Sequence, residues 1–240
     1  MKKDSGTKFR TTGSSGLRCS TRFQLIVLLA FFLLAGAPLV AEPQVHAAPA
    51  ATALGVLEQL SVKGRAPKTG YNRAEFGHAW ADEDHNGCDT RNDMLRRDLR
   101  DTTVKPKTHD CVILTGFLID PYSGDRIDFT RGPRSADIQI DHVVALSNAW
   151  QTGAGNWTAG KRQTLANDPL NLLAVQGWLN SQKGDGDAAT WLPPRKDYRC
   201  AYVARQVAVK ARYGLWVTPP ERDAIARILG RCPSEPLPTR

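Results

Sequence analysis

Residues 138–187 constrain the fold of this chain most, because their polar side chains stand at the ends of short apolar segments. One apolar segment, residues 136–140, alternates enough to predict a short strand, and residues 171–175 predict a second strand. Residues 177–183 then predict a short helix. The order strand, strand, helix predicts a ββα unit within an α+β fold that has additional helices.

The polar residues of this unit are Asp141 and His142 at the end of the first strand, Asn171 at the start of the second, and Asn180 and Lys183 in the helix. Asn180 and Lys183 are three positions apart and therefore project from one face of the helix. His142 has an ordinary pKa near neutrality, which makes it the candidate general base. The side-chain amide of Asn171 is expected to brace the loop that aims His142.

A divalent metal ion suits the remaining residues of this set. Asp141 and Asn180 offer hard oxygen atoms, the ligands that Mg²⁺ prefers, and water and substrate oxygens would complete the octahedron. Lys183 is expected to neutralise a phosphate group in the transition state. A water nucleophile, a base and a stabilising cation are what hydrolysis of a phosphodiester requires. The pattern therefore predicts a hydrolytic Mg²⁺ site, with Mn²⁺ as the alternative metal.

The succession Asp-His, Asn-Leu and Asn-x-x-Lys-Gly resembles the HNH (His-Me finger) endonucleases. The likeness is closest to a secreted bacterial branch similar to the C-terminal nuclease domain of a modification-dependent restriction enzyme. The likeness extends over about residues 88–217. It is based on the segments CDTRNDML, DPYSGDRIDF, QIDHVVALSNAW, NDPLNLLAV and WLPPRKDYRCAYVARQV. The resemblance implies His142 as general base, Asp141 and Asn180 as metal ligands, and Asn171 as the structural middle residue of the motif.

The chain departs from the family name at two points. The third signature residue is Asn180 rather than His, and the paired zinc-binding cysteines that brace the finger in some HNH proteins are missing.

The resemblance as a whole implies a secreted endonuclease that cleaves DNA, with RNA as a second substrate. No helix-turn-helix or zinc finger is visible, so contacts to the nucleic-acid backbone should dominate and sequence specificity should be low.

Other interpretations of the same residues stay open. Asp141 precedes an apolar run, residues 143–150, and could cap a helix there, which is a common role of an isolated Asp-His pair. An exported binding or scaffold domain could keep the HNH frame without turnover. A metallohydrolase acting on cell-wall or lipid phosphodiesters is the third hypothesis. Digestion of nucleic acid in the presence of metal separates the first function from the other two.

Basic residues flank the predicted site. Arg126, Arg131 and Arg134 precede the strand that ends in His142, and together with Lys183 they are the predicted substrate-binding cations. The formal net charge of the chain is +8. Without the six basic and two acidic residues of positions 1–50, the totals of 32 and 24 fall to 26 and 22, which leaves +4. This modest charge favours a polyanionic partner only slightly.

The first fifty residues predict a targeting segment. A basic, Ser/Gly-rich start is followed by an apolar run over residues 23–40 and by small residues around Ala47. Cleavage after Ala47 or Ala50 would release a secreted protein. The alternative is an uncleaved membrane anchor with the domain outside, because the run is near the length of a spanning helix. The domain itself is expected over residues 51–232, with a Pro-rich tail at 233–240.

Four cysteines lie after the targeting segment: Cys88, Cys111, Cys200 and Cys232. An even number in an exported chain predicts two disulfides, and four cysteines allow three connectivities. Proximity in the sequence favours Cys88–Cys111 and Cys200–Cys232, which would staple the front and back of the domain separately. No CxxC pair is present, so structural disulfides are favoured over a zinc site.

Residues 82–93 resemble the first half of a calcium loop, with acids and amides at alternate positions before Gly87. The terminal Glu of such loops is replaced by Asp93, a shorter side chain. An Asx-type turn leading into Cys88 is therefore the preferred interpretation, and a Ca²⁺ site is the alternative.

Further elements follow from periodicity. Residues 52–61 and 91–100 predict helices, and 111–119 and 126–129 predict strands. Residues 200–211 place apolar side chains on one helical stripe. Gly214 is expected to end that helix and Thr218 to begin the next. Four basic residues lie outside the stripe and predict a solvated face, with phosphate binding as the alternative: Arg199, Arg205, Lys210 and Arg212.

Overall fold

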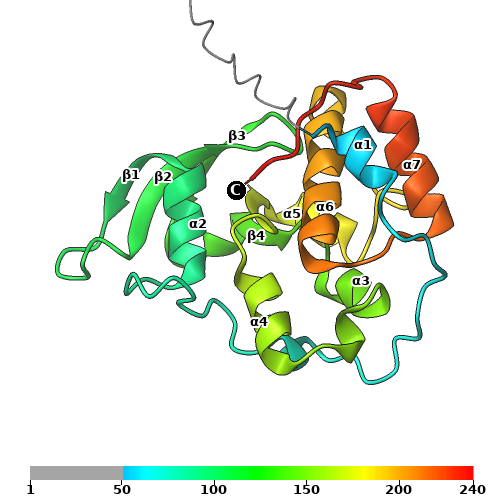
Figure 1. The fold of residues 1–240 in the computed structure, drawn as a ribbon. Coiled ribbons are helices and arrows are strands. Elements are labelled where there is room, and N and C mark those ends of the chain that lie inside the picture. Colours follow the sequence, from blue (N-terminus) through cyan, green and yellow to red (C-terminus); the bar gives the residue numbers. More distant parts are fainter. Residues whose placement is uncertain (1–50, 240) are drawn as a thin grey trace, which may run out of the picture. The chain divides into compact units, whose positions relative to one another are not determined.

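The fold was analysed in a computed structural model that describes residues 51–239, so the targeting segment predicted at 1–50 lies outside the described residues. The architecture is α+β, as predicted. In Figure 1 the strands β1, β2 and β3 lie with α2 on one side of β4, and α6, α7 and α1 lie on the other. In chain order the elements are α1 (Ala53–Leu57), η1 (Arg73–Phe76), α2 (Thr90–Asp98), β1 (Arg100–Val104), β2 (Ile113–Ile119), β3 (Arg126–Thr130), η2 (Ser135–Asp137), β4 (Ile138–His142), α3 (Leu146–Gln151), η3 (Ala154–Asn156), α4 (Ala159–Asn167), β5 (Leu172–Gln176), α5 (Gly177–Lys183), η4 (Lys196–Tyr198), α6 (Arg199–Tyr213) and α7 (Pro219–Leu229).

The strands form two antiparallel sheets. One has three strands in the order β1-β2-β3, and the other consists of β4 and β5 alone. In the second sheet Asp141 pairs with Leu173 and His142 pairs with Leu172. Because α5 follows β5 directly, β4, β5 and α5 form the predicted ββα unit.

The strand β5 is buried on both of its faces. Leu172 and Ala174 pack in an apolar cluster with residues of α2, β2 and β4. Leu173 and Val175 alternate with them and face a second cluster built largely from α6 and α7. Apolar packing on both sides holds this strand, and the residues at its ends, in one position.

The ends of α6 and α7 agree with the prediction. Gly214 ends α6 in the left-handed conformation, at φ 69°. Thr218 and Glu221 form a reciprocal capping box at the start of α7. The predicted solvated basic face of α6 is wrong for Lys210, which is fully buried. Its Nζ lies 2.9 Å from a carboxylate oxygen of Glu221, so a partner on the neighbouring helix draws this lysine inside.

The strand β1 and the helix α4 were not predicted, and one proposed role is wrong. The helix predicted over 91–100 ends at Asp98, and the chain turns directly into β1, a largely polar strand without a clear alternating pattern. The helix α4 was missed because it has no apolar stripe of its own.

Asp141 does not cap the following helix, because α3 begins after Ala145 and has no side-chain cap.

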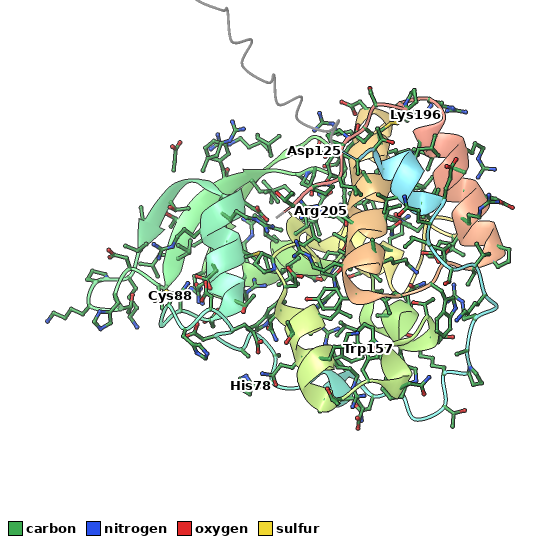
Figure 2. All side chains as sticks on the ribbon, viewed as in Figure 1. His78, Cys88, Asp125, Trp157, Lys196 and Arg205 are labelled. Atoms are coloured by element: carbon green, nitrogen blue, oxygen red, sulfur yellow. A yellow bond between two sulfur atoms is a disulfide. The ribbon has the colours of Figure 1, made fainter. Side chains whose placement is uncertain are left out.

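Both predicted disulfides are present. Cys88–Cys111 joins the start of α2 to the connection between β1 and β2, and Cys88 is labelled beside α2 in Figure 2. Cys200–Cys232 joins α6 to the segment after α7. That segment returns to the start of the described chain, where the Ala53 amide donates to the Glu235 carbonyl at 2.9 Å.

The acidic loop at residues 82–93 is organised by its own hydrogen bonds. The two carboxylate oxygens of Asp82 accept from the amides of Asn86 and Gly87, at 3.1 and 2.9 Å. The side-chain oxygen of Asn86 accepts from the amide of Cys88 at 2.7 Å. These are the bonds of the Asx-type turn.

Within residues 51–239, no helix is both long and apolar enough to span a membrane.

Candidate active site

The carboxylate of Asp141 sits at the centre of a buried polar group. One oxygen accepts a hydrogen bond from the Tyr122 hydroxyl at 2.5 Å, and the other accepts from the Lys183 ammonium at 2.8 Å. Lys183 also donates to the backbone carbonyl of His142 at 2.8 Å. All of these side chains are buried, and Lys183 has none of its side chain exposed. Burial, reinforced by the charge of Asp141, raises the pKa of Tyr122 well above its ordinary value.

These bonds restrict what Asp141 and Lys183 can do. A buried carboxylate with an ammonium partner and a hydroxyl donor is held in one orientation. The ammonium of Lys183 uses two of its three donors inside the protein, so it fixes the end of β4 from α5. Asn180 and Lys183 both face β4, where they contact Gln139 and Asp141, so they project from one side of α5 as their spacing predicted.

His142 is buried, and one of its ring nitrogens is engaged. Its Nε2 lies 2.9 Å from the carbonyl oxygen of Ala166. Because a carbonyl only accepts, Nε2 must carry the proton, and in the neutral ring Nδ1 is then the nitrogen that can accept one. Trp80 stacks on the imidazole with 6.0 Å between ring centroids and 14° between planes. Burial, followed by the positive charge of Arg73, lowers the pKa of His142 to about 4.

Asn171, directly before β5, binds the backbone of the segment that follows β4. Its side-chain oxygen accepts from the Val144 amide at 2.8 Å, and its nitrogen donates to the Val144 carbonyl at 3.3 Å. Its own backbone carbonyl accepts from the Val143 amide at 2.8 Å. The fully buried Asn171 thus holds the two residues that follow His142.

Asn180 projects from α5 beside the end of β4. Its side-chain nitrogen donates to the Gln139 side-chain oxygen at 2.8 Å. That bond turns the amide so that its oxygen remains as an acceptor or ligand. With Asp141 and His142, Asn180 lines a cavity of about 200 Å³ that we call the catalytic cleft, together with Tyr71, Arg73, Ile140, Ala145, Leu146, Gly184 and Asp185.

A second, smaller cavity touches His142 from another direction. It is lined by Trp80 and Ala166 as well as Arg73 and His142. Sequence reasoning missed Tyr71, Arg73 and Trp80, because they come from a segment without any motif. Asp185 was also missed, although its place two residues after Lys183 could have indicated it.

The predicted substrate-binding arginines do not enter the catalytic cleft. Arg126 and Arg134 line a separate groove with Trp178, and each is paired with a nearby aspartate, at 3.0 and 2.8 Å. Arg131 donates to the backbone carbonyl of Ile113 at 2.6 Å and to the side chain of Asn92 at 2.5 Å. The structure therefore separates these cations from His142.

The donor atoms of the cleft fit a hard divalent cation. Asn180 offers an amide oxygen, and each carboxylate oxygen of Asp141 has a second lone pair beside its hydrogen bond. One carboxylate and one neutral oxygen, with water and phosphate oxygens completing the shell, is a usual set for Mg²⁺. Among residues 51–239, the only cluster of three His, Cys, Asp or Glu ligands is Cys200, Cys232 and Glu235, and its two cysteines form a disulfide.

Comparison with known families decides the affiliation. The family model for the C-terminal domain of GmrSD restriction endonucleases matches residues 89–228, more than half of the chain. The chain belongs to this family. The GmrSD C-terminal family points to an endonuclease, and the matched region contains Asp141, His142, Asn171, Asn180 and Lys183. The suspected HNH affiliation is confirmed.

A relative supports an extracellular setting. The chain is similar to an uncharacterized secreted protein of Arthroderma benhamiae, with 37% identity over 211 residues, 87% of this chain and 98% of that protein. The two disulfides fit an oxidising compartment outside the cytosol. No solved structure matches the chain significantly.

Proposed function

We propose that this GmrSD C-terminal family member is a secreted, metal-dependent endonuclease that hydrolyses phosphodiester bonds in DNA with little sequence specificity. RNA is its second expected substrate. The observation that carries the proposal is the placement of His142 beside Asp141 and Asn180 in one cleft, with Nε2 tied to the Ala166 carbonyl. Family membership supports the nuclease chemistry, and the secreted relative supports export.

His142 acts as the general base in this proposal. A water molecule attacks phosphorus and its proton passes to Nδ1 of the neutral imidazole, while the bond between phosphorus and the leaving oxygen breaks and that oxygen takes up a proton from solvent water. The bond from Nε2 to Ala166 keeps the ring in the tautomer that this step needs. Trp80 restricts rotation of the ring by stacking on it.

In the free protein, burial and then the positive charge of Arg73 lower the pKa of His142. A bound phosphodiester brings a negative charge into the cleft that opposes the contribution of Arg73 and so favours transfer of the water proton to the imidazole.

Asp141 and Asn180 would hold the metal ion. When bound, a Mg²⁺ or Mn²⁺ ion supplies positive charge for the phosphate and the leaving oxygen. Lys183 and Tyr122 hold the Asp141 carboxylate in one orientation through hydrogen bonds, and Gln139 orients the amide of Asn180. In this proposal Lys183 positions Asp141, rather than contacting phosphate as the sequence predicted.

Digestion of supercoiled plasmid tests the proposal. The secreted chain, with both disulfides intact, is incubated with Mg²⁺, Mn²⁺ or EDTA beside His142→Ala. We expect nicking with metal, none with EDTA, and a rate roughly a hundredfold to ten-thousandfold lower in the variant. Equal nicking by both proteins would refute His142 as the base. No nicking of DNA or RNA under any metal would leave a binding domain or another phosphodiesterase.

A further inference from the structure

A segment that precedes the matched family region borders the catalytic cleft. We call residues 61–80 the strap. It begins with a bridge to the segment after α6. The Val217 amide donates to the Ser61 carbonyl at 3.0 Å, and the Lys63 amide donates to the Val217 carbonyl at 3.1 Å. Ala66 then donates to the carbonyl of Gln151, the last residue of α3, at 2.9 Å. In Figure 1 the strap runs in light blue from α1 past α3 to α4.

Two ion pairs tie the strap to the chain that follows α5. Arg65 donates to the buried carboxylate of Asp187 at 2.5 Å. Lys68 donates to Asp185 at 2.8 Å, and Asp185 itself lines the catalytic cleft. The strap is therefore attached at the point where the ββα unit ends.

The backbone around Arg73 is also fixed. The side chain of Asn72 caps η1 by accepting from the Ala74 amide at 3.0 Å. Glu75 accepts from Arg162 of α4 at 2.7 Å through its backbone carbonyl, and Phe76 is buried at 2% exposure. Figure 2 shows His78 of the strap beside α4. The position of Arg73 is thus set by contacts on both sides, although its own side chain is exposed.

The side chain of Arg73 reaches both cavities that adjoin His142. It lines the catalytic cleft with Asp141 and Asn180, and it lines the second cavity with Trp80. Within residues 51–239 its guanidinium forms no ion pair, whereas Lys68 and Lys183 near the cleft are both paired with carboxylates.

We infer that Arg73 binds the non-bridging oxygens of the phosphodiester that the cleft cleaves. This inference rests on the proposed nuclease function and assigns to Arg73 the role that the sequence predicted for Lys183. A guanidinium presents two parallel donors to a phosphate in a planar fork, so less side-chain entropy is lost per hydrogen bond than with an ammonium. The strap is then part of the substrate site, although it lies outside residues 89–228.

Three variants test this assignment. Arg73→Gln removes the charge, Arg73→Lys keeps the charge but not the paired donors, and Arg222→Gln is the matched control. Arg222 is an exposed arginine of α7 that lines neither cavity and pairs only with its neighbour Asp223, at 3.4 Å. Far-UV circular dichroism and the urea midpoint establish that each variant is folded.

Binding and turnover are measured separately. Binding of a fluorescein-labelled DNA duplex is titrated at several salt concentrations in a His142→Ala background, so that cleavage does not intervene. We expect Arg73→Gln to reduce the slope of log K against log salt by about 1, and Arg222→Gln and Arg73→Lys to keep it. In the otherwise wild-type protein, kcat/KM for plasmid nicking should fall roughly tenfold to a hundredfold for Arg73→Gln and less for Arg73→Lys.

The outcomes separate this inference from the proposed function. If the wild-type protein cuts DNA while Arg73→Gln keeps both the salt slope and kcat/KM, the assignment of Arg73 is wrong and the nuclease function stands. If the wild-type protein neither binds nor cuts nucleic acid, the proposed function is wrong, and the role of Arg73 falls with it.

Discussion

Acid should destabilise this protein through His142. Burial and the charge of Arg73 lower the pKa of the folded-state imidazole from 6.5 to about 4. Between these two values the unfolded chain binds a proton that the folded chain does not, so stability is lost as pH falls from about 6.5 toward 4. This lowering of the pKa corresponds to a loss of about 3 kcal/mol in the free energy of unfolding between pH 7 and pH 4.

Urea denaturation followed by tryptophan fluorescence measures this loss. Wild type and His142→Gln are unfolded at pH 7 and pH 4 in the presence of EDTA, which keeps metal from the cleft. Glutamine stays neutral at both pH values and can still donate to the Ala166 carbonyl, which accepts from His142 at 2.9 Å. The free energy of unfolding of the wild type should fall by about 3 kcal/mol more than that of the variant. Equal losses in the two proteins would refute the burial argument.

Other interactions give predictions for the free energy of unfolding. Replacing Cys200 and Cys232 by serine opens a loop with a sequence separation of 32 and should lower the free energy of unfolding in urea by about 3–4 kcal/mol. A loss below about 1 kcal/mol would contradict this role of the disulfide. Tyr122→Phe removes a hydrogen bond to a buried carboxylate and should cost about 2 kcal/mol, whereas an unchanged urea midpoint would mean the bond contributes nothing. Lys210→Met leaves the Glu221 carboxylate buried without its cation and should cost about 3–5 kcal/mol. Adding Glu221→Gln, which removes the negative charge and can still accept from the Thr218 amide, should recover most of that loss, and no recovery would contradict the ion-pair explanation.

The sequence predicted the ββα unit well because its pattern is local. β4, β5 and α5 all lie within residues 138–183, and the sequence of that segment alone places His142 at the end of β4 and Asn180 within α5. The disulfides and the capping box of α7 are likewise local or favoured by sequence proximity. Such features depend little on how distant parts of the chain pack.

The parts that could not be predicted depend on distant contacts. Spacing placed Lys183 on the correct helix face, but only the packed structure shows its ammonium on Asp141 rather than facing solvent. Lys210 is buried because Glu221 of the next helix meets it. Arg73 belongs to a strap without periodicity or motif, and nothing in its neighbourhood in the sequence points to His142.

Chemical rescue of His142→Ala is a direct test of His142 as the general base. Removing the imidazole leaves a space between Trp80 and the Ala166 carbonyl, next to two cavities through which a small molecule can enter. The rate of plasmid nicking by this variant is measured with Mg²⁺ at increasing imidazole concentration, with the wild type as control. We expect the rate to rise with free imidazole in the variant and to stay constant in the wild type. A variant that nicks as fast as the wild type without imidazole would contradict the role of His142 as general base.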